Sequence, residues 1–211
     1  MIAPGENTSP PTDSQLLASH LAGDHEAFGV LVRRYRRELF NFLARYTGDP
    51  ALADDVFQET FLQLHISAAT FDTNKRLKPW LFTIAANKAK DALRRRARKR
   101  AAPLDASIGG DQDERMRFSS LLEADVPSPD EIAANQETRQ AVQEIVNAMP
   151  ENLRIVLLLN YFHDLAYKEI ADVLEVPLGT VKSRLHAAVK EFGNRWKIAA
   201  GRLKHDGSTE H

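Results

Sequence analysis

Apolar residues in the first hundred positions recur at intervals of three and four, the spacing of helices that each bury one face. The longest such set comprises Phe28, Leu31, Val32, Tyr35, Leu39, Phe42, Leu43 and Tyr46. Helix N-termini are marked by Thr12 with Gln15, which fit a capping box, and by Asp49 followed by Pro50. The pattern predicts helices over about residues 12–22, 25–47, 50–66 and 79–100, with a loop at 68–78.

A second helical pattern begins at Ile132. It predicts a helix that ends at Met149-Pro150, a nearly all-apolar helix from Leu153 to Phe162, and two short helices after it. Between the two patterns, residues 101–131 have no helical period and carry more acidic than basic side chains, as in a flexible tether.

These patterns predict an all-α fold in which two small helical domains are joined by a flexible acidic linker. The expected boundaries are a disordered leader at 1–11, an N-terminal helical bundle at 12–100, the linker at 101–131, a C-terminal helix-turn-helix domain at 132–198 and a polar tail at 199–211.

The two short helices lie between Tyr167 and Phe192 and flank a break at Glu175-Val176-Pro177. Their apolar residues share inner faces, which is typical of a helix-turn-helix. Near its N-terminal end, where a recognition helix enters the major groove, the second helix carries outward polar residues: Thr180, Lys182, Ser183, Arg184 and His186. The alternative is an ordinary helical hairpin with a solvated face.

The helix expected at residues 50–66 has two apolar faces. Phe57, Phe61 and Leu64 are predicted to join the core, whereas Leu62 and Ile66 lie on the opposite side. That outer pair is flanked by Asp55, Gln58 and Glu59, which is typical of a protein-docking patch. Scattered exposed apolar residues without a function are the alternative.

The helix that begins at Pro79 becomes strongly basic after its first turns, with Lys88, Lys90, Arg94, Arg95, Arg96, Arg98, Lys99 and Arg100 against the single acid Asp91. A basic helix can be a solvated face, a calmodulin-like target or a membrane-surface helix. Because no apolar stripe continues beyond Leu93, we favour phosphate binding.

The composition of the chain excludes several classes of protein function. The formal net charge is −1, so bulk charge does not indicate a nucleic-acid binder, and the absence of cysteine excludes disulfides and thiolate chemistry and favours a reducing cytoplasm. No apolar run is long enough for membrane insertion, and the first residues do not form a signal peptide. We find no nucleophile, cofactor or metal motif, and we interpret Asp54, Asp55 and Glu59 as the rim of the docking patch rather than a metal cluster.

Two separate segments resemble one family. Glu169-Ile170-Ala171 and Val176-Pro177-Leu178-Gly179-Thr180-Val181-Lys182-Ser183-Arg184-Leu185 resemble the −35-reading region of bacterial extracytoplasmic-function (ECF) sigma factors of the sigma-70 family. Gly48-Asp49-Pro50, Asp54-Asp55-Val56, Gln58-Glu59-Thr60-Phe61 and the run from Trp80 to Asn87 resemble the family's region 2. Departures are Met149 for leucine, Asp164 for glycine, Leu77 for an aromatic residue, and Ala187 and Ala188 where many relatives are more basic.

The resemblance implies a protein without an active site or cofactor that binds core RNA polymerase and promoter DNA. It implies that Asp55, Gln58, Glu59 and Leu62 dock on the β′ coiled coil, with the β flap as a second polymerase contact. It assigns the −10 element to Phe71, Lys78, Trp80, Asn87, Lys88, Arg94 and Arg95, and the −35 element to Thr180, Lys182, Ser183, Arg184 and His186. An anti-sigma factor is a further implied partner.

The resemblance also implies that the acidic linker threads a basic polymerase channel. An alternative is that the linker folds back on the basic run and weakens DNA binding by the free protein. Two other functions are open at this point: a helix-turn-helix regulator that binds an operator by itself, and a helical adaptor for protein partners.

Overall fold

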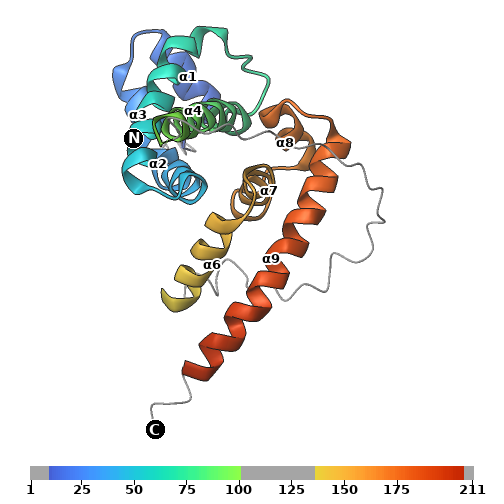
Figure 1. Cartoon of the computed structure of the whole chain (residues 1–211). Coiled ribbons are helices and arrows are strands. Elements are labelled where there is room, and N and C mark those ends of the chain that lie inside the picture. The colour runs from blue at the N-terminus through green and yellow to red at the C-terminus, as the bar shows by residue number, and fades with distance from the viewer. Residues whose placement is uncertain (1–9, 101–135, 207–211) are drawn as a thin grey trace, which may run out of the picture.

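The computed structural model describes residues 10–100 and 136–206, and within these ranges every regular element is a helix (Figure 1). This confirms the all-α prediction. The leader, the acidic linker and the end of the tail lie outside the described residues, apart from the leader's last two positions. The elements are α1 (Asp13–Leu21), α2 (His25–Thr47), α3 (Pro50–Ser67), the 3₁₀ turn η1 (Ala68–Thr70), α4 (Leu77–Arg100), α6 (Gln136–Ala148), α7 (Glu151–Leu157), the π-helical turn η3 (Leu158–Phe162), α8 (Tyr167–Leu174) and α9 (Leu178–Asp206).

The predicted capping signals are present. Thr12 and Gln15 form a reciprocal capping box on α1, and Asp24 accepts hydrogen bonds from the first backbone N–H groups of α2. Gly48 ends α2 in the left-handed conformation with φ of 67°, which glycine adopts without a Cβ clash. Asp49 caps α3 by accepting from the backbone of Ala51 and Leu52.

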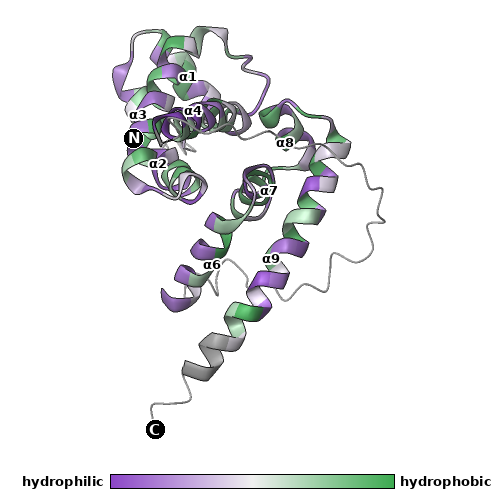
Figure 2. Cartoon of the chain, in the orientation of Figure 1, coloured by the Kyte–Doolittle hydropathy of each residue, from purple (hydrophilic) through white to green (hydrophobic). Residues whose placement is uncertain are grey.

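Helices α1 to α4 form an N-terminal bundle around the buried face of α2 (Figure 1). Leu39, Phe42 and Leu43 are fully buried, and the ring of Phe42 packs against Phe82 of α4. Green stripes in Figure 2 mark these apolar faces, with the hydrophilic residues in purple. Burial of these stripes, at about 25 cal/mol per Å² of apolar surface, is what stabilises helices that would be marginal alone.

The C-terminal half consists of α6, α7, η3, α8 and α9. The predicted helix from Leu153 to Phe162 begins earlier, at Glu151, and its last five residues form a π turn rather than α-helix. The turn into α8 contains Asp164 with φ of 52°, a left-handed position that explains why glycine suits this site and why aspartate is tolerated. Glu175 (φ 55°) makes the turn between α8 and α9.

Helix α9 is longer than the sequence predicts. It continues without interruption to Asp206, past residue 199, where the sequence predicts the start of a polar tail. Trp196 stacks on Phe192, with ring centroids 6.4 Å apart. In Figure 1 the C-terminal part of α9 runs beyond α6 and away from the N-terminal bundle.

The two halves are packed against each other and not only tethered. Helix α8 packs on α4, and α2 contacts α6 and η3 (Figure 1). Tyr46 of α2 donates a 2.7 Å hydrogen bond to Glu151 of α7, and Arg76 pairs with Glu169 of α8 at 2.7 Å. The sequence patterns do not predict this interface.

Candidate nucleic-acid interface

The predicted recognition residues lie in the first three turns of α9, but they do not form one cluster. Val181, Leu185 and Phe192 are buried against the C-terminal core. At 100° per residue, the opposite side centres on Ser183, which is exposed and donates to the carbonyl of Thr180 at 3.1 Å. Thr180 and Arg184 lie on one flank of Ser183, whereas Lys182 and His186 lie on the other.

Of the two alanines that depart from the family pattern, only one can face DNA. Ala188 is fully buried, so its side chain has no bearing on backbone contacts, contrary to the expectation that grouped it with Ala187. Ala187 is half-buried on the side of Ser183. Lys190 is exposed seven residues after Ser183, on the same face, and is a candidate DNA contact that the sequence-based prediction missed. Its two-turn spacing from Ser183 is the signal that would have identified it.

The predicted −10 residues divide between two sides of α4. Helical geometry places Asn87 and Arg94 within about 40° of Trp80, and Lys88 and Arg95 within about 80°. Asn87, Arg94 and Arg95 are exposed, and Lys88 is half-buried. Lys78 lies about 200° from Trp80. It pairs with Glu38 of α2, and only 20% of its side chain is exposed. The structure therefore separates Lys78 from the other six residues.

An aromatic pair lies near the N-terminal end of α4, on the side of the helix that carries Trp80, Asn87 and Arg94 (the Trp80 side). Phe71, at the end of η1, stacks on Trp80 with ring centroids 4.8 Å apart and an interplanar angle of 27°. Both side chains are half-buried at the edge of the core. Because an aromatic face stacks on any base, this pair is suited to hold an unstacked nucleotide.

The exposed apolar pair predicted on the outer side of α3 is present. Leu62 is 60% exposed and Ile66 is 65% exposed, while Phe61 and Leu64 on the other side of the helix are buried. Asp55 and Gln58 are exposed on the side of Leu62, and Glu59 is half-exposed. Gln58 is held by Asp54 through a 2.9 Å hydrogen bond. The four residues predicted to dock therefore share one face of α3.

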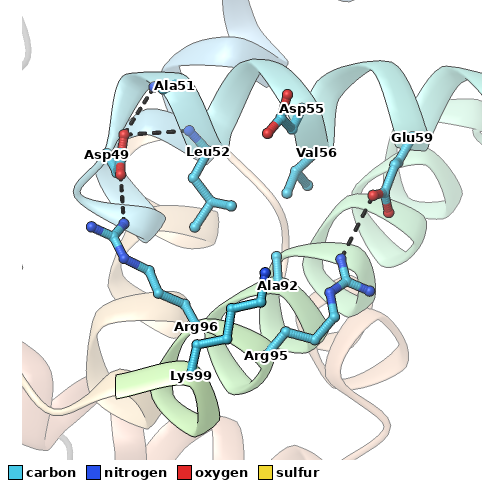
Figure 3. Close-up of a pocket in the computed structure, with 10 residues that line it drawn as sticks. All are labelled: Asp49, Ala51, Leu52, Asp55, Val56, Glu59, Ala92, Arg95, Arg96 and Lys99. Carbon is cyan, nitrogen blue, oxygen red and sulfur yellow. Dashed lines mark hydrogen bonds and ion pairs between the residues drawn. The ribbon is translucent and has the colours of Figure 1, made fainter.

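A groove of about 420 Å³ separates this face of α3 from the basic end of α4. Figure 3 shows Arg96 directed toward Asp49 and Arg95 toward Glu59, with Lys99 between them. The N–O distances are 2.5 Å for Arg96–Asp49 and 3.6 Å for Arg95–Glu59. The hydrogen bond from the Leu52 N–H, together with those from Ala51 and Arg96, lowers the pKa of Asp49. Acidic residues of α3 thus neutralise part of the basic run at the end of α4. These pairs join residues far apart in the sequence.

Lys90 lies on the side of α4 that faces the C-terminal half, and charged residues of both halves surround it. Burial lowers the pKa of Lys90, Glu151 and Glu175 raise it, and Arg94 and Arg184 lower it. Arg184 of the recognition helix therefore lies within electrostatic range of α4. The two predicted DNA-binding sets approach each other at this point.

Two absences apply to the described residues only. Within 10–100 and 136–206, no group of three or more His, Cys, Asp or Glu side chains is arranged to hold a metal ion. No helix in that part of the chain combines the length and apolarity that crossing a bilayer requires.

Two family models match the chain in order: sigma-70 region 2 over residues 31–99 and sigma-70 region 4 over residues 139–192. Solved structures with similar folds include CnrH in complex with the cytosolic domain of CnrY, with a TM-score of 0.62 and 24% identity over 89% of this chain and 99% of that chain. The sigma factor RpoE in complex with the anti-sigma factor NepR, from Bartonella quintana, has a TM-score of 0.60 and 19% identity over 81% and 97%.

Curated relatives cover nearly the whole chain. The RNA polymerase sigma-H factor of Pseudomonas aeruginosa is 32% identical over 83% of this chain and 89% of its own length. The ECF sigma factor SigW of Bacillus subtilis is 31% identical over 78% and 86%, and the ECF sigma-E factor of Escherichia coli K12 is 30% identical over 87% and 94%. The chain therefore belongs to the ECF sigma factors of the sigma-70 family, which direct promoter-specific initiation of transcription.

Proposed function

We propose that three surfaces divide the work of initiation: the Leu62 face of α3 binds core RNA polymerase, the Trp80 side of α4 captures the −10 element, and the Ser183 face of α9 reads the −35 element. The observation that carries this assignment is the exposed, polar Ser183 face of a helix whose opposite side is fully buried. A helix anchored in this way can enter a major groove without losing its packing.

Polymerase docking follows from the chemistry of the α3 face. An apolar centre with a polar and acidic rim is the usual anatomy of a protein interface. The partner is the coiled coil of the β′ subunit, with the β flap as the contact of the C-terminal half. The protein works in the cytoplasm, where both polymerase and promoter are found.

Substituting Leu62 with aspartate is expected to weaken binding to core polymerase about tenfold, because a charge replaces an apolar anchor at the centre of the patch. Titration of a fluorescently labelled protein with core polymerase measures this. Leu21→Asp is the matched control, since Leu21 is 52% exposed on α1, outside the patch. Equal weakening by both variants would contradict the assignment.

Capture of the −10 element relies on stacking. Separating a duplex forfeits about 1.4 kcal/mol per base step, and a base held on an aromatic face recovers about 1–3 kcal/mol. A few captured bases can therefore keep a bubble open without nucleotide hydrolysis. Trp80 and Phe71 supply the aromatic faces, while Asn87, Lys88, Arg94 and Arg95 contact the polar edge and the phosphates. Lys78 joins this set only after it leaves Glu38.

The recognition helix has room for a stronger backbone contact at Ala187. Ala187→Lys is expected to tighten binding of holoenzyme to −35-containing duplex by about 1 kcal/mol, because it adds one phosphate contact beside Ser183. The slope of log affinity against log salt should steepen by about 1. Ala18→Lys, on an exposed face of α1, is the control. An identical gain from the control would show that only net charge matters.

An inhibitory partner is also proposed. Both solved relatives are complexes with a second protein, CnrY in one and the anti-sigma factor NepR in the other. An anti-sigma factor for this chain would have to cover at least one of the three surfaces. Because the chain has no cysteine, any redox signal must be sensed by that partner.

Run-off transcription with purified core polymerase tests the whole assignment. The protein is expected to confer initiation at a promoter that core polymerase alone does not use. If it conferred no new start site and instead bound duplex DNA tightly by itself, a stand-alone regulator would be the better assignment. The region 2 match before the helix-turn-helix favours the sigma function over that regulator and over an adaptor.

A further inference from the structure

His163 is buried at the interface between the two halves, although it begins the turn between η3 and α8. Only 3% of its side chain is exposed. Its ring meets Phe42 of α2 edge-on at 5.6 Å and packs on Phe82 of α4 at 5.1 Å. A residue of the C-terminal half therefore packs against a contacting pair of aromatic rings of the N-terminal bundle.

The two ring nitrogens of His163 have different surroundings. Nδ1 lies 3.4 Å from Oε1 of Glu38, whereas Nε2 is buried without a hydrogen-bond partner among the described residues. A neutral ring fits this environment, since Nδ1–H can donate to Glu38 and Nε2 carries no proton. A protonated ring would present Nε2–H to an apolar space, at the cost of an unmade hydrogen bond.

Burial opposes a second proton on the ring, and the charges around it act in both directions. Glu38 and Arg45 face it from α2, and Lys78 faces it from α4. Burial is the largest effect and lowers the pKa of His163; Glu38 raises it, and Lys78 and Arg45 lower it. Glu38 is itself shared, because it pairs with Lys78. Burial opposes its ionisation, but its contacts with His163 and Lys78 outweigh burial and lower its pKa.

Other contacts hold the same interface. Tyr46 binds Glu151, Arg76 pairs with Glu169, and the Arg45 guanidinium lies 4.3 Å above the Phe162 ring. Each is separate from the ring of His163. Loss of the His163 contact alone therefore weakens the interface without removing every contact in it.

The packed arrangement is incompatible with promoter binding, if the proposed function holds. The −10 and −35 elements are about 25 base pairs apart, which is roughly 85 Å at about 3.4 Å per base pair. Helix α9, with 29 residues, is only about 44 Å long. The α9 and α4 surfaces approach each other through Arg184 and Lys90, so they cannot reach both elements until the halves separate.

We propose that His163 is a proton-sensitive latch: its neutral ring helps to hold the two halves in the packed, promoter-incompetent state, and protonation shifts the equilibrium toward the separated state. The proposal rests on the proposed function for its consequence, but the latch itself is a property of the free protein.

The direction of the pH effect follows from linkage. In the separated state His163 is solvated and titrates near its usual pKa of about 6.5, whereas its pKa in the packed state is lower. Above about pH 6.5 the ring is neutral in both states, and the packed state keeps its full stability. As pH falls below this value only the separated state binds a proton, so opening becomes more favourable. The equilibrium constant for opening should rise by up to about tenfold between pH 7.5 and 5.5.

Resonance energy transfer between two dyes tests the latch in the full-length protein. Because the chain has no cysteine, Asn41→Cys on α2 and Asn194→Cys on α9 give two unique labelling sites, both exposed. Transfer efficiency is expected to fall as pH decreases from 7.5 to 5.5, while helical circular dichroism stays constant. Constant transfer over this range, or a fall matched by loss of helicity, would overturn the proposal.

Two variants isolate the ring. His163→Phe keeps an aromatic ring against Phe42 and Phe82, and His163→Gln keeps a donor toward Glu38, but neither titrates. In a His163 variant whose two halves stay packed at pH 7.5, the transfer efficiency should not change with pH. His25→Gln replaces an exposed histidine, and its transfer efficiency should fall with pH as in the parent. A fall in transfer that persists in both His163 variants would overturn the latch. The experiment contains neither DNA nor polymerase, so its failure would leave the proposed sigma function standing.

Discussion

Replacing both Lys182 and Arg184 with alanine is expected to lower initiation at a −35-dependent promoter on the order of 100-fold. The two residues lie on opposite flanks of Ser183, so together they bound the face of α9 that enters the groove. An arginine that reads a base edge contributes about 1–3 kcal/mol, and a lysine on a phosphate adds about 1 kcal/mol. Their combined loss of about 3 kcal/mol corresponds to the stated factor.

Run-off transcription on two templates measures this effect, one with an intact −35 element and one with that element scrambled. The double variant should lose activity on the first template and resemble the parent on the second. Arg33→Ala with Arg37→Ala removes the same amount of positive charge from an exposed face of α2 and serves as the control. Unchanged use of the intact promoter would show that α9 is not the reading helix.

Trp80→Ala is expected to reduce the population of open complexes about 30-fold while leaving binding to duplex −35 DNA intact. The indole stacks on Phe71 at the edge of the bundle. Removing it takes away one aromatic face and the support of the second, a loss of about 2 kcal/mol for a captured base. Duplex opening is not otherwise driven, so this loss appears directly in the open population.

Permanganate reactivity of −10 thymines measures that population. Trp80→Phe keeps an aromatic face and should remain within a few-fold of the parent. Since Trp80 is half-buried, thermal unfolding of both variants separates a loss of stacking from a loss of fold. A Trp80→Ala variant that melts promoters normally would move the −10 site away from this end of α4.

The proposed DNA contacts and the proposed His163 latch should respond differently to salt and to pH. Phosphate contacts by α9 and α4 weaken as salt rises, because counterions compete for the backbone. The latch at His163 is buried and should depend on pH far more than on salt. Measuring promoter binding as a function of salt and of pH therefore distinguishes weak DNA contacts from a protein whose two halves are still packed together.

The exposed faces of α3 and α9 could be predicted from the sequence for the same reason. A helix with 3.6 residues per turn places Leu62 opposite Leu64, and Ser183 opposite Leu185, whatever the rest of the fold does. Errors arose where that rule was not applied residue by residue. Ala188 was grouped with Ala187 although a step of 100° carries it into the core, and Lys190 was overlooked on the exposed face.

Periodicity within one helix does not indicate contacts between helices. The family resemblance grouped Lys78 with Trp80, yet Lys78 lies on the other side of α4 and pairs with Glu38. Arg95 and Arg96 belong to a basic run in sequence, but Glu59 and Asp49 of α3 lie opposite them.

The sequence by itself determined the helices, their capped ends, the faces they bury and the family, because these depend on local preference and on the spacing of apolar residues. Only the tertiary structure decided how the two halves meet. The packing of His163 against Phe42 and Phe82 joins residues more than eighty positions apart, and no periodicity within one helix encodes such a contact. Charge pairing and burial between distant segments are properties of the packed chain, and they determine which of its basic residues are available to DNA.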